Sequence, residues 1–202
     1  MLNLGAGPAT RAAIRQFKGS VREVCGADID PVVLSNDELD KAVLIEDGKV
    51  DFPSDHFDLI YSDFVIEHVE NPREFLTETL RMLKPGGKYF FRTPNLFHYV
   101  ALISWITPQS FHEFIANRIR QLPEDAHEPW PTFYRLNTRA AIETEAGAVG
   151  FSGIDIEFIE PNPSYLQFHP VPLLLGVAYE RTVNSTDLLR SFRSNIIGTL
   201  AK

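Results

Sequence analysis

The chain has 202 residues, 44% of them hydrophobic and 23% charged, which fits one globular domain with a core of its own. Its single cysteine, Cys25, excludes a disulfide framework and a multi-cysteine zinc site, and it favours the reducing cytoplasm as the compartment. The formal net charge of −8, without a basic stripe, argues against nucleic acid as a partner, and the longest apolar runs are too short to span a membrane.

The first half of the chain alternates short apolar runs with helical patterns, which is typical of βαβ units and a parallel sheet. Strands are expected over Met1–Leu4, Val21–Ala27, Ala42–Ile45, Phe57–Ser62 and Lys88–Arg92. Helices are expected over Pro8–Phe17, over a short segment capped by Asp30, and over Pro72–Leu83. The last of these ends at a stop signal of proline and paired glycines.

The second half of the chain differs from the first in composition and in periodicity. Between Leu96 and Asn137 aromatic, histidine and proline residues are dense and the periodicity weakens. A helix over Asn137–Ala148, capped by Asn137 or Thr138, and strands over Phe151–Ile159 and Ser194–Ala201 are expected to follow. Only two residues precede the first motif, which favours a leader segment missing from this sequence over a family member without one.

Two short motifs close the first two expected strands. Asn3-Leu4-Gly5-Ala6-Gly7 places a glycine turn where the backbone must turn tightly and approach a ligand closely. Asp28 follows about 20 residues later, the separation at which a carboxylate accepts hydrogen bonds from ribose hydroxyls in dinucleotide sites. We assign the ribose role to Asp28 and helix capping to Asp30. These two motifs are compatible with a nicotinamide-dependent oxidoreductase as well.

Further motifs distinguish a nicotinamide-dependent oxidoreductase from another kind of enzyme. Phe52–Val69, which contains Phe-Asp-Leu-Ile and Glu-His-Val, resembles the central signature of small-molecule class I S-adenosylmethionine-dependent methyltransferases of the type 11-like group. Arg81–Gly87 and Thr93–Asn95 continue the pattern in the family's order. The resemblance covers residues 1–95 and implies a Rossmann-like α/β fold: a seven-stranded, mostly parallel sheet with a reversed last strand and helices on both faces.

The resemblance also implies a division of labour within a single domain, residues 1–202. Residues 1–95 would bind S-adenosylmethionine, residues 96–148 would recognise the acceptor as an insertion or lid, and residues 149–202 would complete the sheet. The implied cofactor residues are Asn3, Gly5, Ala6 and Gly7 at the methionine part, Asp28 at the ribose, Ile29, Asp47 and Gly48 at the adenine, and Ser62 and Asp63 below the sulfonium. The family usually has an acidic residue at Asn3 and a third glycine at Ala9, so weaker binding is expected.

The chemistry demands little of the protein, because a sulfonium methyl group is already activated and needs an acceptor held in line about 3–3.5 Å away. A hydroxyl acceptor also needs a general base. His68 is the candidate base, and a structural brace for its loop is the alternative. Asp63, Glu67 and His68 resemble part of a metal cluster of ubiquinone-type O-methyltransferases. That cluster has a further carboxylate where this chain has Phe64, so no metal is predicted.

The aromatic insertion is expected to supply the acceptor pocket. The candidates are Tyr99, His112, Tyr134 and Arg135, with Trp105, His127 and Trp130 as further ones, and core or lid packing is the alternative for each. Arg135 could bind a carboxylate or phosphate. We predict methyl transfer to a small molecule, with oxygen as the methylated atom. A nicotinamide-dependent oxidoreductase, disfavoured by the absent third glycine, and a non-catalytic methyltransferase-like module are the alternatives, and a homodimer is compatible with the sequence.

Overall fold

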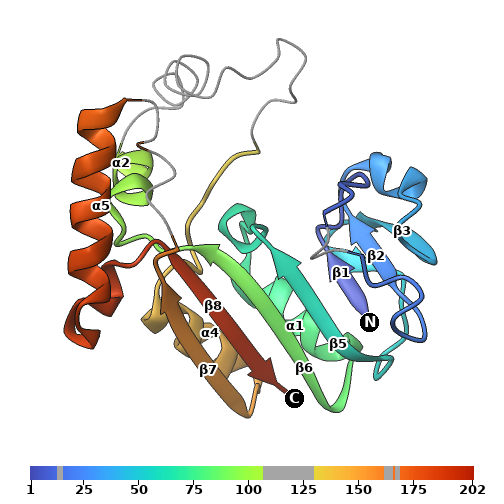
Figure 1. The fold of residues 1–202 in the computed structure, drawn as a ribbon. Coiled ribbons are helices and arrows are strands. Elements are labelled where there is room, and N and C mark those ends of the chain that lie inside the picture. Colours follow the sequence, from blue (N-terminus) through green and yellow to red (C-terminus); the bar gives the residue numbers. More distant parts are fainter. Residues whose placement is uncertain (13–15, 107–129, 162–165, 167–168) are drawn as a thin grey trace.

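The computed structural model describes residues 1–12, 16–106, 130–161, 166 and 169–202, except for the side chains of residues 103–106. One sheet of eight strands forms its centre, in the order β4-β3-β2-β1-β5-β6-β8-β7 (Figure 1). The strands are β1 Leu2–Leu4, β2 Cys25–Asp28, β3 Lys41–Glu46, β4 Lys49–Val50, β5 Phe57–Asp63, β6 Leu83–Pro94, β7 Gly153–Ile159 and β8 Asn195–Ala201. The helices are α1 Pro72–Met82, α2 Tyr99–Ile106, α4 Arg139–Val149 and α5 Pro170–Asn184, with short 3-10 helices η2 Pro31–Ser35, η3 Ile66–His68 and η5 Asp187–Phe192.

The strand directions confirm the expected fold class. β3, β2, β1, β5 and β6 run parallel to one another, whereas β8 runs antiparallel to both of its neighbours, β6 and β7. The chain adds β2, β3 and β4 on one side of β1, and it adds β6 on the other side of β5. The strand order therefore switches direction between β1 and β5. In open α/β sheets such a switch point leaves a crevice at the carboxyl ends of the strands. None of the described helices is both long and apolar enough to cross a membrane.

The sequence reading missed the eighth strand, β4, which is the second arm of a hairpin with β3. Glu46 pairs with Lys49, and the two residues between them, Asp47 and Gly48, both have positive φ, 50° and 71°. Two successive positive φ angles match a type I′ turn, for which Asp-Gly is a favoured sequence. The hairpin therefore follows from local chemistry that the sequence displays.

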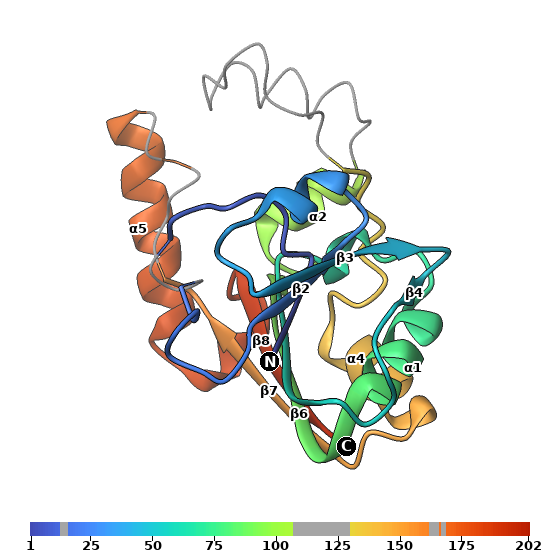
Figure 2. The same cartoon turned by 90° about the vertical axis from the view of Figure 1, so that its right-hand side faces the viewer.

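The core lies between the sheet and the pair α1 and α4, which cover one face, while α5 stands on the opposite side beside β7 and β8 (Figure 2). In β6 the alternation of a half-buried strand is clear: Tyr89 and Phe91 are buried against the helices, and Lys88 and Phe90 are exposed on the other face. Ile60 of β5 and Ile142 of α4 belong to the same buried cluster.

The prediction of a helix over Pro8–Phe17 is wrong, because residues 8–12 and 16–17 form no helix. Tertiary contacts override the local pattern there. The backbone N–H groups of Thr10 and Arg11 both donate to the carboxylate of Glu38, and Arg11 has a φ of 58°, a left-handed conformation that a right-handed helix cannot continue. The second strand also begins later than expected, at Cys25.

Two of the expected caps are confirmed. The Asp30 carboxylate accepts the N–H of Val32 at the start of η2, and the Thr138 hydroxyl accepts the N–H of Ala141 at the start of α4. At its other end, α4 stops at Gly150, whose φ of 110° lies in the left-handed region that favours glycine.

Gly198 of β8 provides a test of core packing. A Cβ at this position would lie 2.0–2.6 Å from ring atoms of Phe91, whereas a Cβ at Gly147 in α4 would meet nothing within 4 Å. We expect Gly198→Ala to lower the free energy of unfolding by about 1–3 kcal/mol through overpacking. Gly147→Ala, the matched control, should be neutral or stabilising by up to about 1 kcal/mol through helix propensity. Urea denaturation checks both, and equal effects of the two substitutions would contradict this account.

Candidate functional site

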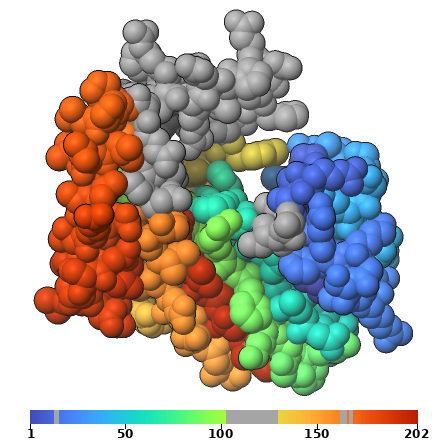
Figure 3. Space-filling model, in the orientation of Figure 1, coloured from blue at the N-terminus to red at the C-terminus, as the bar shows by residue number. Residues whose placement is uncertain are grey.

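A cleft with a volume of about 810 Å³ opens where the carboxyl ends of β1, β2 and β5 meet. Figure 3 shows this hollow between the N-terminal part of the chain in blue and the yellow segment that follows the grey residues. Its lining residues are Leu4, Gly5, Asp28, Ile29, Ile45, Asp47, Gly48, Val50, Asp63, Phe64, Val65, His68, Val69, Glu70, Asn71, Glu74, Phe75, Glu78, Thr79, Met82, Trp130, Pro131 and Phe133. Both its size and its mixed lining fit a small-molecule site.

Asp28 is aimed at the glycine turn. Its Oδ2 accepts the Gly7 N–H at 2.8 Å, and its Oδ1 accepts the Asp30 N–H at 2.9 Å. A carboxylate offers about four lone-pair sites, so two sites remain for hydroxyl groups of a ligand. Ile29, next in the chain, exposes 54% of its surface although it is apolar, and it lines the same cleft.

Gly5 allows the glycine turn to lie directly against the loop after β5. Its φ is 76°, and a Cβ built on it would lie 2.3 Å from Cγ2 of Val65. Only a residue without a side chain permits this conformation and this approach together. The turn and the loop therefore form one continuous wall of the cleft.

The residues after β5 are held by an arginine from β6. Arg92 Nε and Nη2 donate to the two carboxylate oxygens of Asp63 at 2.7 and 2.9 Å, and the Arg92 guanidinium lies 4.6 Å from the centre of the Phe64 ring. Phe64 has a φ of 57°, a conformation that is rare for a bulky residue and concentrates at functional sites. The ion pair and the ring contact hold the loop in this conformation.

Residues 130–135, called the strap below, bring a distant part of the chain to the cleft. His68 Nδ1 lies 2.9 Å from the carbonyl oxygen of Pro131. A carbonyl oxygen only accepts hydrogen bonds, so Nδ1 must carry a proton, and in the neutral tautomer with this proton Nε2 keeps its lone pair. This tautomer leaves a proton acceptor on a residue that lines the cleft.

Glu67 fixes the strap through its backbone and the loop through its side chain. Its carbonyl oxygen accepts the N–H groups of Phe133 and Tyr134 at 2.8 and 3.1 Å. Its buried carboxylate accepts from the Thr93 hydroxyl, which in turn accepts from the Asn137 amide. Burial raises the pKa of Glu67 above its ordinary value, because the charged carboxylate loses hydration.

Most of the expected cofactor residues lie together in the cleft. Those that line it are Gly5, Asp28, Ile29, Asp47, Gly48 and Asp63, joined by the candidate base His68. Asn3, Ala6, Gly7 and Ser62 do not line it. Ser62 is turned into the core, where its hydroxyl lies 2.6 Å from the Tyr89 hydroxyl, and Asn3 is buried within β1.

The acceptor candidates are dispersed. Trp130 lines the cleft, whereas the ring of Tyr99 packs against His98 and Tyr179. Tyr134 contributes a backbone hydrogen bond to Glu67 and does not line the cleft. His112, His127 and the side chain of Trp105 lie outside the described residues.

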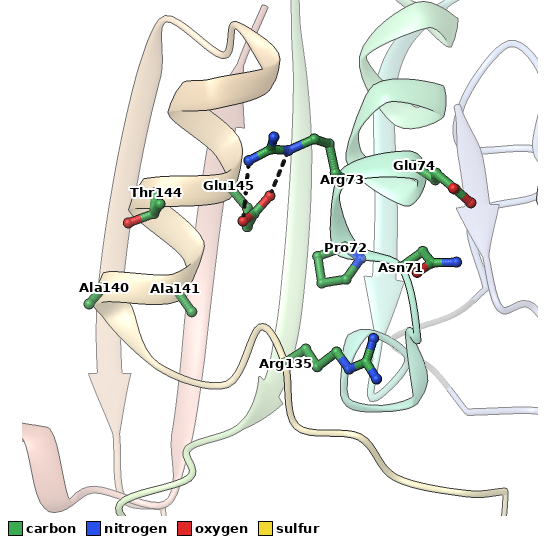
Figure 4. Close-up of a pocket in the computed structure, with 9 residues that line it drawn as sticks. All are labelled: Asn71, Pro72, Arg73, Glu74, Arg135, Ala140, Ala141, Thr144 and Glu145. Atoms are coloured by element: carbon green, nitrogen blue, oxygen red, sulfur yellow. Dashed lines mark hydrogen bonds and ion pairs between the residues drawn. The ribbon is translucent and has the colours of Figure 1, made fainter.

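Arg135 lines a second cavity of about 590 Å³ between α1 and α4 rather than the cleft. Its Nη1 donates to the carbonyl oxygen of Glu70. Figure 4 shows Arg73 directed at Glu145 and Glu74 directed the other way. Arg73 Nε lies 3.1 Å from Oε2 of Glu145. The second cavity and the cleft share Asn71 and Glu74 at the start of α1.

The sequence reading missed one wall of the cleft, which a single face of α1 provides. This face consists of Glu74, Phe75, Glu78, Thr79 and Met82, and the N-cap residue Asn71 extends it. Their spacing of three and four residues is that of one helical stripe. The helix was predicted, so the stripe was visible in the sequence, but its direction depends on how α1 packs.

Residues 2–91 match the model of the family described as "Methyltransferase domain". A mitochondrial ubiquinone biosynthesis O-methyltransferase of Dictyostelium discoideum is 34% identical over 79 residues, 39% of this chain and 22% of that protein. A ubiquinone biosynthesis O-methyltransferase of Xanthomonas oryzae pv. oryzae is 29% identical, covering 46% of this chain and 48% of that protein. The alignments thus span less than half the length of these relatives.

Solved structures resemble the whole chain in fold. A phosphoethanolamine N-methyltransferase 2 of Haemonchus contortus, in complex with S-adenosyl-L-methionine, aligns with a TM-score of 0.58 at 18% identity, over 100% of this chain and 48% of that one. An S-adenosylmethionine-dependent methyltransferase of Mesorhizobium loti aligns with a TM-score of 0.58 at 15% identity, over 100% of this chain and 90% of that one. At these identities the likeness establishes the fold.

The buried Glu67 makes stability depend on pH in a direction that can be tested. Its raised pKa means that the folded chain keeps a proton that the unfolded chain releases above about pH 4.3. The free energy of unfolding should therefore fall as pH rises through this window. Glu67→Gln, which keeps an oxygen for the Thr93 hydroxyl, should gain stability relative to wild type as pH rises above about 4.3 in urea titrations. A difference between Glu67→Gln and wild type that does not change with pH would contradict burial as the cause.

Proposed function

We propose that the protein transfers a methyl group from S-adenosylmethionine to a hydroxyl group of a small molecule. The match of residues 2–91 to the family described as "Methyltransferase domain" and the likeness in fold to methyltransferases that use this cofactor support the proposal. The observation that carries this proposal is the Asp28 carboxylate, which faces the glycine turn with two hydrogen-bonding sites unused. The likeness to ubiquinone O-methyltransferases over part of the chain supports oxygen as the methylated atom.

The residues of the cleft fit this cofactor. Asp28 would hold the two ribose hydroxyls, and the exposed apolar side chain of Ile29 would pack on the adenine. The hairpin turn of Asp47 and Gly48 would border the adenine, and Gly5 would leave its backbone accessible to the methionine part. Asn3, Ala6, Gly7 and Ser62 would act by shaping the turn and the floor, since their positions lie behind the lining residues.

His68 is the proposed general base. S-adenosylmethionine supplies an activated methyl group, so the protein's tasks are to orient the acceptor and to remove its proton. The hydrogen bond of His68 Nδ1 to Pro131 leaves Nε2 as the proton acceptor. The same bond closes the strap over the cleft, so His68 both braces the loop and presents its free nitrogen. The two roles that the sequence left as alternatives are thus compatible in one residue.

The expected division of the chain is retained as part of this proposal. Residues 1–95 bind the cofactor, the described end of residues 96–148 contributes the strap to the acceptor side, and β7 and β8 within residues 149–202 complete the sheet. The cytoplasmic compartment, inferred from the single cysteine, stays a prediction, as does a homodimer.

Substitution of Asp28 tests the cofactor assignment. We expect Asp28→Ala to weaken binding of S-adenosylhomocysteine by about 10- to 100-fold, the loss of charge-assisted hydrogen bonds worth about 1.5–3 kcal/mol. Isothermal titration calorimetry measures this. Asp30→Ala is the matched control, because Asp30 caps η2 through Val32 and should cost about 1 kcal/mol of stability without loss of affinity. Unchanged affinity in Asp28→Ala, or tight binding of NAD alone, would overturn the assignment in favour of the oxidoreductase or the non-catalytic alternative.

Substitution of His68 tests the base. With a panel of small phenols as acceptors and release of S-adenosylhomocysteine as the assay, His68→Gln should lower kcat by about 100-fold or more. Its affinity for S-adenosylhomocysteine should stay within about twofold of wild type, because the ring is assigned to the acceptor and not to the cofactor. An unchanged kcat would leave His68 with its structural role alone.

A further inference from the structure

Three buried side chains form a row of hydrogen bonds that ends at Glu67, the residue before His68. Asn137 Nδ2 donates to the Thr93 hydroxyl at 2.7 Å, and the Thr93 hydroxyl donates to Oε2 of Glu67 at 3.1 Å. Asn137 and Thr93 are fully buried, and Glu67 exposes 4% of its surface. None of these three residues lines the cleft, so the row acts on the site only through the segments that it joins.

The donors along this row can point in one direction only. Asn137 Nδ2 also donates to the Pro94 carbonyl oxygen at 2.7 Å, and because a carbonyl oxygen only accepts, the nitrogen and the oxygen of the amide are fixed. The Thr93 oxygen therefore accepts from Asn137, and its own proton is free for Glu67. Glu67 can accept this proton whether its carboxyl group is charged or protonated, because both forms keep an acceptor oxygen.

The row joins the three segments on which the position of His68 depends. Thr93 lies at the end of β6, and Glu67 lies in η3 together with His68. Asn137 lies two residues beyond the strap, which leads down to the end of β6 (Figure 1). The base of the strap is thereby fastened to the sheet, and the sheet to η3.

Glu67 is held on two sides by this arrangement. Its carboxyl group receives the Thr93 hydroxyl, and its carbonyl oxygen receives two backbone N–H groups of the strap. η3 is a single turn whose N-cap residue forms no side-chain hydrogen bond, so its orientation depends on the core packing of Ile66 and on the hydrogen bonds of Glu67. Nδ1 of His68 reaches the Pro131 carbonyl oxygen only while η3 and the strap keep this relative position.

At Asn137 the donors matter more than the packing. Its Oδ1 is buried and accepts no hydrogen bond among the described residues. A buried carbonyl oxygen without a donor lowers stability, and an apolar side chain of similar size would avoid that loss. The position therefore keeps an amide for the two hydrogen bonds that it donates, to Thr93 and to Pro94.

We propose that Thr93 and Asn137 are positioning residues for the base: through Glu67 they keep η3 and the strap in the arrangement that holds the proton of His68 on Nδ1 and leaves Nε2 as the proton acceptor. This inference rests on the proposed function, because a base is needed only where the methyl acceptor is a hydroxyl group. A ring released from Pro131 would exchange between its two tautomers, and the tautomer with its proton on Nε2 cannot take up a proton there.

A purely structural role for the row makes a different prediction. Substitution of Thr93 would then act on the site only by loosening the fold, as would any comparable loss of packing in η3. Ile66, the neighbour of Glu67 in this turn, is buried in the core and takes no part in the row. Ile66→Val removes one methylene group from the same turn, which lowers stability and leaves the hydrogen bonds in place, so it is the matched control.

NMR measures the tautomer of His68 from the chemical shifts of its two ring nitrogens, in the full chain with isotopically labelled histidines and in alkaline buffer, where an imidazole is neutral. His68→Gln identifies its signal among those of the six histidines. In wild type we expect the tautomer protonated on Nδ1 to exceed the other by about tenfold, the ratio that one net hydrogen bond gives. Thr93→Val should bring the two tautomers to equal populations, whereas Thr93→Ser, which keeps the hydroxyl, and Ile66→Val should keep the wild-type ratio.

Turnover of the panel of small phenols gives a second readout. Thr93→Val should lower kcat by about tenfold, because a displaced ring loses its alignment with the acceptor as well as its tautomer. Affinity for S-adenosylhomocysteine should stay within about twofold of wild type, since the row does not reach the residues assigned to the cofactor. Thr93→Ser should restore kcat.

If Thr93→Val does not fold, the double substitution Thr93→Val with Glu67→Met takes its place, because replacing donor and acceptor together by apolar groups is nearly neutral for stability. It should give the same equal populations. An unchanged ratio in the folded variant, an equal shift in Ile66→Val, or a wild-type ring protonated on Nε2 overturns the proposal. Failure of the proposed function is distinct, since wild type would then not bind S-adenosylhomocysteine, whereas the tautomer ratio is measured without any ligand.

Discussion

The site depends on one hydrogen-bonded junction, the Asp28 carboxylate between the Gly7 N–H and the Asp30 N–H. It joins the turn after β1 to the end of β2, at the switch point where the sheet leaves a crevice. The described residues that follow this turn, 8–12 and 16–17, form no helix, so in them no helix N-terminus presents its N–H groups to a ligand. The carboxylate, and not a helix dipole, organises this end of the cleft.

The opposite wall is made by contacts between segments far apart in the chain. The strap is fastened to the loop after β5 by His68, by the carbonyl oxygen of Glu67 and by the guanidinium of Arg135. These bonds fix the tautomer of His68 and bring Trp130 to the rim of the cleft. The tautomer of His68 and the position of Trp130 are thus set by the same few bonds, while one face of α1 contributes carboxylates to the lining of the cleft.

Secondary structure and fold class were largely predictable where periodicity and turn chemistry agree. The alternation in β6, the stripe of α1 and the caps at Asp30 and Thr138 are local patterns, and each corresponds to the structure. The helix over Pro8–Phe17 failed because Glu38, distant in sequence, takes up its backbone N–H groups. The β3–β4 hairpin was missed although Asp47-Gly48 is a strong turn signal.

By itself, the sequence determined the strands other than β4, the helices α1 and α4, the glycine turn with its partner Asp28, and the family signature over residues 1–95, because these depend on neighbouring residues and on spacing. Tertiary structure alone decided which side chains face the cleft. It turned Ser62 into the core, placed Arg135 in the second cavity and directed Glu74 toward the cleft, since the rotation of a strand or helix is set by what packs on its other side.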